Sequence, residues 1–260
     1  MCIELVSGQS HWTFSPKESR AGLIARKAIE NDNRNLGAAT INYTPYFSWE
    51  KGLFSVGADL PLSHFVEVDS SINQVALGNL GFWVAWRLEK SSLITVGTRV
   101  PLAKSSDVEK LEAFEWGNQV SLENKDAFYV DGLPISVAYS AQFKVLERYS
   151  VNVGVAPLYM IQLNSDSSKS NEIYIKSNLG FGYGFQHFFM ELGANGIAYL
   201  NKIDSKEGVY VDFYDVVEYR RNGLGLGFLL KIPVNKEVRK DFRLVLGVNL
   251  SYYFGKAKEY

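Results

Sequence analysis

The sequence predicts an all-β fold, a transmembrane antiparallel β-barrel of the up-and-down type, with about twelve strands and about fourteen as the alternative. Apolar and polar residues alternate with period two almost everywhere after residue 38, which is typical of strands with one apolar and one polar face. The alternating segments are long, and short and long connections between them take turns along the chain. Together these three features favour a membrane barrel over a soluble sandwich.

The predicted strands are long enough to cross a bilayer. Most span about eleven to fifteen residues, whereas strands of soluble proteins average roughly five or six. A tilted transmembrane strand needs roughly nine to eleven residues. The eleven segments with this alternation are Ala39–Trp49, Phe54–Leu62, Ala76–Leu88, Ile94–Leu102, Leu133–Val145, Val151–Leu163, Ile173–Phe185, Phe188–Leu200, Val209–Phe213, Leu224–Val234 and Leu244–Phe254.

The connections differ in length in a regular way. Short links lie at 50–52, 89–91, 147–148, 186 and 220–222. Longer polar links lie at 63–73, 103–131, 164–171, 201–208 and 235–241. Bacterial outer-membrane barrels have tight periplasmic turns and longer extracellular loops, so we expect the short links to face the periplasm.

Aromatic residues and the last strand support this orientation. Amphipathic rings gather at headgroup level and form girdles around such barrels. The final strand, FRLVLGVNLSYYF, resembles the C-terminal assembly signal of outer-membrane proteins, followed here by the tail 255–260. The aromatic residues expected in the girdle near the short links are Trp49, Trp86, Tyr149, Phe185, Phe188, Tyr219, Tyr252 and Phe254.

An even number of strands requires one more strand before residue 38, because the segment that starts there runs inward. The expected first strand is Cys2–Gly8 or His11–Phe14. The alternative with fourteen strands adds Phe114–Leu122 and the stretch AFYV at 127–130.

Residues 15–33 form the one helix-like stretch, since Ser15 suits a cap, Pro16 a first turn, and Glu18 follows Ser15 by three residues. Within it, SRAGLIA at Ser19 to Ala25 resembles the NPAGLA-type N-terminal region of the fatty-acid transporter (FadL-like) family. The resemblance implies a helical segment that plugs the lumen; an extracellular loop with a helical turn is the alternative. We therefore expect a first strand with a plug or extracellular segment in 1–37, the barrel in 38–254 and a tail in 255–260.

Bulk composition excludes several classes of protein. The net charge of −1 and the pI near 6.3 provide no basic field, so no nucleic-acid partner is expected. The single cysteine, Cys2, excludes an intramolecular disulfide and a cysteine-based zinc cluster. We expect no metal and no cofactor.

The polar register of each strand is expected to face the lumen, because an arginine or lysine facing lipid at mid-depth costs about 2–4 kcal/mol. Mixed charges there form either a conduction path with a transverse field or an ion-pair network that fills a narrow barrel. Asp215 falls in the apolar register, so we expect a bulge near Tyr214 that turns it inward. The predicted pore-lining residues are Asp59, Arg87, Arg99, Lys144, Lys176, Glu191, Asp212, Lys231 and Arg243.

Three strands share a pattern in which a proline follows a charged residue by two positions: VGADLPL, VGTRVPL and LLKIPV. Asp59, Arg99 and Lys231 are expected to face the lumen in these segments, with apolar neighbours facing lipid. Because proline cannot donate to a strand ladder, Pro61, Pro101 and Pro233 are expected to end regular pairing at the outer rim. Their lipid-facing neighbours are predicted to be Val56, Leu60, Val96, Val100, Phe228 and Ile232.

Two other functions, lipid hydrolysis and nucleotide binding, have weaker support in the sequence. A lipid hydrolase needs a serine activated by a histidine, and His64, beside Ser63 and Glu67, is the histidine at a suitable depth. The glycines of LGFGYGF and NGLGLGF recur inside strands, whereas a phosphate loop leads into a helix, so we expect them to let lumen side chains pack or the wall curve. No catalytic residue is predicted.

These observations predict a porin-like transport protein of the Gram-negative cell envelope, a channel or transporter for small or amphipathic molecules. A structural or adhesive barrel is the alternative, and an outer-membrane lipid hydrolase is the weaker one. The expected partners are outer-membrane lipid, the barrel-assembly machinery and a small-molecule substrate.

Overall fold

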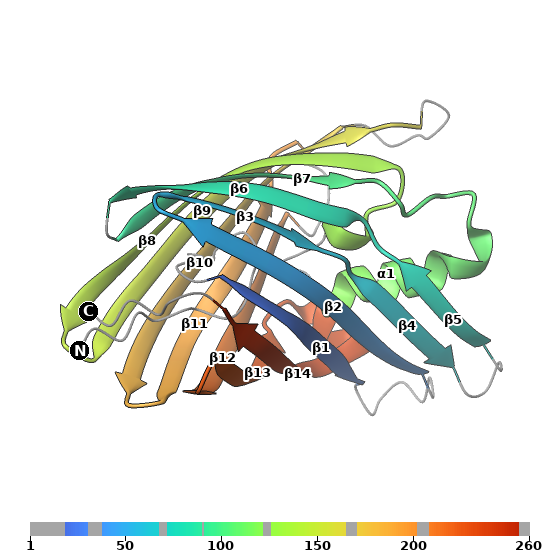
Figure 1. Ribbon diagram of the computed structural model, residues 1–260. Coiled ribbons are helices and arrows are strands. Elements are labelled where there is room, and N and C mark those ends of the chain that lie inside the picture. Colours follow the sequence, from blue (N-terminus) through green and yellow to red (C-terminus); the bar gives the residue numbers. More distant parts are fainter. Residues whose placement is uncertain are drawn as a thin grey trace.

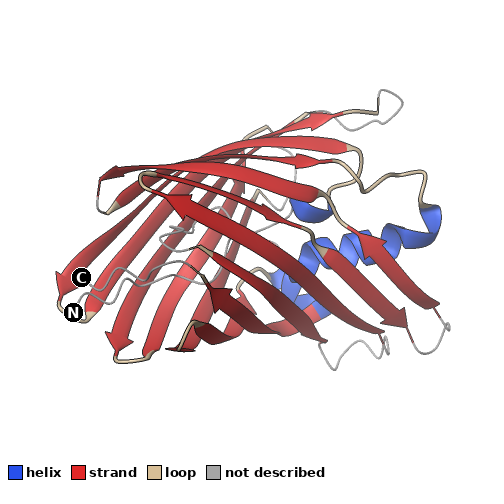
Figure 2. Cartoon of the chain, viewed as in Figure 1, coloured by secondary structure: helices blue, strands red, loops and turns tan. Residues whose placement is uncertain are grey.

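A computed structural model describes residues 19–30, 38–67, 72–89, 91–121, 126–164, 171–201 and 208–254 (Figure 1). Strands dominate it, as Figure 2 shows. They are β1 (Arg20–Glu30), β2 (Ala38–Lys51), β3 (Phe54–Asp59), β4 (Leu62–Glu67), β5 (Ile72–Leu77), β6 (Leu80–Glu89), β7 (Ser92–Val100), β8 (Gly132–Leu146), β9 (Tyr149–Gln162), β10 (Glu172–Phe185), β11 (Phe188–Tyr199), β12 (Val209–Arg221), β13 (Leu224–Pro233) and β14 (Phe242–Tyr253). The helical segments are the 3₁₀ helix η1 (Val108–Lys110), α1 (Leu111–Val120) and α2 (Lys236–Asp241).

The sheet closes on itself. Antiparallel pairing runs from β1 through β14 and successive strands to β7, β6, β3 and β2, and β1 pairs with β2 to complete the ring. β4 continues the line of β3 after Pro61, and β5 leads into β6 through Gly78 and Asn79. The barrel therefore has twelve strands with two extra strands, β4 and β5, which confirms the predicted fold.

Alternation separates the two faces of the wall. In β7, Leu93, Thr95 and Arg99 point inward and are buried, whereas Val96 and Val100 point outward and are exposed. Exposed apolar residues of this kind surround the barrel, as expected for a surface that meets lipid rather than water. Among the described residues, no helix is long and apolar enough to cross a membrane.

Aromatic side chains gather at the short-turn end, as predicted. Phe54 stacks on Trp86 with ring centroids 5.4 Å apart, and Phe188 contacts Tyr219 at 4.9 Å. Near the chain ends, Phe254 stacks on Phe47 at 5.6 Å and donates its backbone N–H to the carbonyl of Ser19 at 2.9 Å. Both described chain ends therefore lie at the short-turn end.

The helical interpretation of residues 15–33 is wrong over Arg20–Glu30, which forms β1. This strand pairs with β14 and β2 and is part of the wall, so residues 20–30 do not plug the lumen. Both candidate first strands, Cys2–Gly8 and His11–Phe14, lie outside the described residues. Within the described part of the chain, the barrel begins at Arg20 rather than at residue 38.

The segment 101–131, between β7 and β8, supplies the helix instead. It carries η1, α1 and a 3₁₀ turn at 126–128, and we call it the insert; the structure describes its residues 101–121 and 126–131. Residues 114–120 are helical and 127–130 lie in the turn region, so the alternative with two additional strands in this segment is wrong. In Figures 1 and 2, α1 lies at the long-loop end of the barrel, beside β4 and β5.

Two of the three prolines lie where regular pairing ends, as predicted. Pro101 follows β7 directly and Pro233 is the last residue of β13, both toward the long loops. Pro61 separates β3 from β4, but pairing with β2 resumes at Leu62 and continues to Glu67, so the prediction that Pro61 ends regular pairing is wrong. Within the three repeated patterns, the lysine, arginine and aspartate face inward, since Asp59, Arg99 and Lys231 are all buried.

The predicted bulge near Tyr214 is wrong. The register of β12 with β11 and β13 is continuous through Tyr214 and Asp215. Tyr214 points inward and is buried, while Asp215 stays in the outward register, paired with Leu192 and Leu230, and is half-buried.

Candidate functional site

The insert folds into the long-loop end of the lumen and packs there through an apolar face. Ala113 and Phe114 of α1 are buried against Phe65 of β4 and Ala76 of β5. Phe128, from the turn at the other end of the insert, completes this cluster. Because Phe65 and Ala76 belong to the inner face of the wall, α1 occupies space that belongs to the lumen.

Polar side chains of β1 and β2 hold the C-terminal end of α1. Asn42 donates its Nδ2 to the carbonyl of Gly117 at 2.8 Å and to Oγ of Ser121 at 3.0 Å. Arg26 donates Nη1 to the same Oγ at 3.2 Å. Asn42 thus adds a second hydrogen bond to the carbonyl of Gly117, which already accepts from the backbone N–H of Ser121 at 3.2 Å, and both side chains fix the residue that follows α1.

Asn79, fully buried between β5 and β6, holds both ends of the insert. Its Nδ2 donates to the carbonyls of Asp126 and Tyr129, at 3.1 and 2.8 Å. Its Oδ1 accepts from the backbone N–H groups of Leu102 and Ala103, at 2.9 and 3.0 Å. One side chain therefore provides four hydrogen bonds that fix where the insert leaves and re-enters the wall.

Asp126 links the insert to two different strands of the barrel. Nε of Arg99 in β7 donates to its Oδ2 at 2.6 Å, and Lys176 in β10 forms an ion pair with its Oδ1. Arg99 also donates Nη1 to Oδ1 of Asp59 at 2.6 Å. Since β8 and β9 separate β7 from β10 in the sheet, Asp126 bridges two parts of the wall.

The carboxyl of Asp126 is fully buried, and it is ionised because of its partners. Burial by itself raises the pKa of Asp126, but Lys176 and Arg99 reverse this effect and hold the pKa well below its usual range. A lowered pKa contributes stability above the unfolded-state value of about 3.9, and this contribution is lost as pH falls toward the folded-state value. The bridge therefore persists at neutral and mildly acidic pH.

Six of the nine predicted lumen residues are buried on the inner face: Asp59, Arg99, Lys176, Glu191, Asp212 and Lys231. Arg99 and Lys176 pair with Asp126, and Asp59 pairs with Arg99. Nζ of Lys231 lies 3.8 Å from Oδ2 of Asp212, whose Oδ1 accepts from Asn195 at 2.8 Å. Their role in lining a pore stays a prediction.

The other three predicted residues lie near the ends of the strands. Arg87 points inward at the short-turn rim, where its Nη2 lies 2.5 Å from Oε1 of Glu50. Lys144 is in the inward register of β8 but is exposed near the turn. Arg243 lies at a register irregularity of β14, where Phe242 and Val245 take the buried positions and Arg243 is exposed.

Glu191 lies flat against the wall. Its carboxylate accepts from Asn152 at 2.5 Å and from the hydroxyl of Tyr214 at 2.6 Å. A Cβ added at Gly180 would lie 2.6 Å from Oε1 of Glu191, and one at Gly193 would lie 2.4 Å from Tyr214. The in-strand glycines therefore make room for large lumen side chains, as the sequence predicted.

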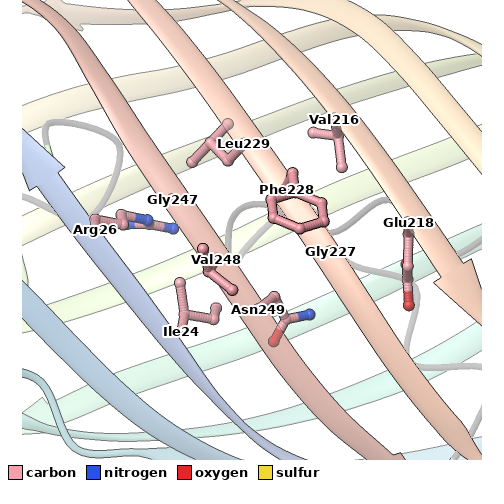
Figure 3. A pocket seen from close by; sticks show the side chains of 10 residues that line it. All are labelled: Ile24, Arg26, Val216, Glu218, Gly227, Phe228, Leu229, Gly247, Val248 and Asn249. Carbon is pink, nitrogen blue, oxygen red and sulfur yellow. The ribbon is translucent and has the colours of Figure 1, made fainter.

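A shallow recess in the inner wall of β1, β12, β13 and β14 has glycine as its floor (Figure 3). Gly227 and Gly247 lie beneath it, with Asn249 beside them. Arg26 and Glu218 lie on opposite sides of the recess in Figure 3. Tyr46 from β2 donates its hydroxyl to Oδ1 of Asn249 at 3.1 Å.

The residues considered for lipid hydrolysis do not form a catalytic pair. His64 is in the outward register of β4, with Nε2 2.8 Å from Oδ1 of Asn73. Ser63, its neighbour, is fully buried on the inner face against Gly117. Within the described residues, no group of three or more His, Cys, Asp or Glu side chains is arranged to hold a metal ion.

The sequence prediction missed the residues that anchor the insert: Asn42, Asn79, Ser121 and Asp126. Asn79 and Asp126 lie in irregular backbone, so alternation does not identify them. A signal for α1 was present, since Ala113, Gly117 and Val120 recur at helical spacing.

The sequence matches no protein-family model and no curated protein. The structure is similar to an outer membrane channel from Pseudomonas putida F1, with a TM-score of 0.62 and 10% identity over 95% of this chain and 100% of that chain. It is also similar to the NanC porin, with a TM-score of 0.52 and 9% identity over 90% of this chain and 100% of that chain. A further similar structure is the translocator domain of the autotransporter NalP from Neisseria meningitidis, with a TM-score of 0.51 and 10% identity over 92% and 90% of the two chains.

At these identities the similarity concerns the fold. The predicted resemblance to bacterial outer-membrane β-barrel proteins is confirmed at that level. The closed barrel, its outward apolar face and its aromatic girdle place the chain in the outer membrane. From the usual orientation of such barrels, the short turns are expected to face the periplasm and the insert to lie at the extracellular mouth.

Proposed function

We propose that the protein is an outer-membrane channel for small or amphipathic molecules, whose extracellular mouth is restricted by the insert. The observation that carries the proposal is the bridge from Asp126 to Arg99 and Lys176, which holds a folded segment inside the lumen. The fold similarity to outer-membrane channels supports the same function class. No catalytic step is part of the proposal.

The insert restricts passage because a barrel of about twelve strands encloses little free width. Its α1 contacts β1, β2, β4 and β5 from inside, and its turn reaches the inner face of β10 through Lys176. Solutes that enter from outside must therefore pass beside the insert or displace it.

The ends of the insert suit a clean deletion. The backbone N–H of Asp131 donates to the carbonyl of Ala103 at 3.0 Å, so a linker of about four glycine and serine residues can replace 104–130. In planar bilayers we expect the conductance of this variant to rise several-fold over that of the unmodified protein. Asp126→Asn, which weakens the bridge but keeps its shape, should give more frequent openings of intermediate size.

The control is Lys104→Gln, a change at an exposed insert residue, which should leave conductance unchanged. Folding of each variant is checked by the heat-dependent mobility shift typical of intact barrels. If the folded protein is silent both with and without the insert, the channel proposal is wrong and the structural or adhesive barrel is favoured.

A further inference from the structure

The charged side chains of the lumen are directed at one another or at buried polar partners. Arg99, Asp59, Asp126 and Lys176 form one network, and Lys231 lies beside Asp212. These side chains are at most 9% exposed. Their charge is therefore partly neutralised before a solute in the lumen can meet it.

Glu191, Arg20 and Arg26 are also withdrawn from the lumen. Glu191 is 1% exposed and bound by Asn152 and Tyr214, as described above. Arg20 lies over the ring of Tyr46 at 5.3 Å, and Arg26 is directed at the insert. Both arginines are buried.

The accessible part of the lumen wall has a different chemistry. Within the described strands, the inward-facing residues that stay half-exposed in mid-strand are uncharged. Inward charges that remain half-exposed or exposed, such as Arg87, Lys144 and Arg220, lie close to the periplasmic turns. The uncharged mid-strand set, which we call the neutral belt, is Thr44, Gly154, Asn178 and Asn249. Gly22 and Gly193 are half-exposed as well, but the hydroxyls of Tyr46 and Tyr214 cover their inward side.

The neutral belt occupies two facing parts of the wall. Thr44 and Asn249 flank Ile24 of β1, because both pair with it, from β2 and from β14. Asn178 of β10 pairs with Gly154 of β9. In the closed ring, β14, β1 and β2 lie opposite β8 to β10, as Figure 1 shows.

The recess in Figure 3 belongs to the first of these parts. Its two charged neighbours are directed elsewhere: Arg26 donates to Ser121 of the insert, and Glu218 accepts from Arg220 at 3.0 Å and from Tyr253 at 2.6 Å. Asn249 therefore offers its amide to the lumen over a glycine floor, with no free charge beside it.

We propose that the passage is built for uncharged polar solutes and discriminates weakly between cations and anions. This inference rests on the proposed channel function and specifies its substrate class. Amides, a hydroxyl and glycine backbone line the passage, and they form hydrogen bonds with hydroxyl or amide groups of a solute. They provide no net field that favours one sign of ion. The transverse field considered from the sequence would require accessible charges in mid-strand.

Ion selectivity tests this directly. Reversal potentials are measured in planar bilayers across a KCl gradient for the full chain and for a variant that lacks 104–130 and carries Lys176→Gln. The second change is needed because the deletion removes Asp126, the ion-pair partner of Lys176. We expect a potassium-to-chloride permeability ratio within about twofold of unity, because no accessible mid-strand charge selects either ion. A ratio beyond about fivefold in either direction overturns the inference and leaves the channel proposal intact. Silence of both proteins overturns both proposals.

A designed charge provides the matched comparison. Asn249→Asp keeps an acceptor for the Tyr46 hydroxyl and adds a carboxylate to the belt, so the ratio should shift several-fold toward potassium. Asn249→Ser, which stays neutral, should leave the ratio unchanged. If Asn249→Asp conducts with an unchanged ratio, Asn249 does not face the passage and the inference is wrong.

Solute flux gives the second readout. Proteoliposomes should swell faster in a small polyol than in an organic anion or cation of similar size. Equal or faster swelling with either charged solute contradicts the proposed substrate class.

Discussion

The lumen is filled in two different ways on its two sides. On the side of β1 to β7, a separate segment of chain enters the barrel and brings an apolar cluster and a buried aspartate with it. On the side of β9 to β12, the wall fills its own interior, because Glu191 and Tyr214 lie flat over glycines of neighbouring strands.

This difference distinguishes a segment that can move, the insert, from side chains that must stay in place, those of the wall. A segment held by hydrogen bonds and ion pairs at a few points can detach while the barrel stays closed. Side chains packed over glycines belong to the wall, so their packing and the strand pairing depend on each other. Changes to the insert itself should therefore alter conductance, whereas changes to buried residues of the wall, on either side, should alter the stability of the barrel.

The largest effect is expected at Arg99. Arg99→Met leaves Asp59 and Asp126 buried without their shared cation, which should cost about 3–5 kcal/mol of unfolding free energy. Urea titration of the protein in lipid vesicles measures this. Adding Asp59→Asn and Asp126→Asn removes the uncompensated charge and should recover much of the loss; no recovery would mean that the network does not act through charge.

An intermediate effect is expected at Gly193. A Cβ there would lie 2.4 Å from both the carbonyl of Leu179 and Tyr214, so Gly193→Ala should cost about 1–3 kcal/mol in the same titration. Gly208→Ala is the control, because its added Cβ meets nothing within 4 Å. Equal stability of the two variants would contradict the packing role of the in-strand glycines.

The smallest effect is expected at the periplasmic rim. Arg87 and Glu50 form an ion pair whose side chains are 26% and 16% exposed, so solvent screens it. Arg87→Gln should lower the unfolding free energy by less than about 1 kcal/mol, and the difference from the unmodified protein should disappear in high salt. A larger loss of unfolding free energy that does not depend on salt would show that this pair stabilises the fold in the way the buried Arg99 network does.

The alternation of residues was enough to predict the barrel and eleven of its strands from residue 38 onward, and the preference for an even number supplied the twelfth. The alternation did not predict β4 and β5, because most of β4 lies in the link expected at 63–73. It failed at β1, because Ile24 and Ala28 face inward and are apolar as well. Ala28 packs in a cluster with Val120 and Phe242, so apolar side chains occupy both faces of this strand. The period of two is hidden there, and a capping pattern upstream favoured a helix.

Apart from β1, Asp215 and Arg243, the sequence by itself determined which side chains face lipid and which face inward, since lipid tolerates few charges and strand geometry alternates. Only the tertiary structure decided what fills the lumen. Asn42, Asn79 and Asp126 are separated by tens of residues along the chain, and their roles depend on where the insert meets the wall. The neutral belt is likewise decided by the tertiary structure, because the burial of a charge depends on its partners across the barrel and not on its own position in a strand.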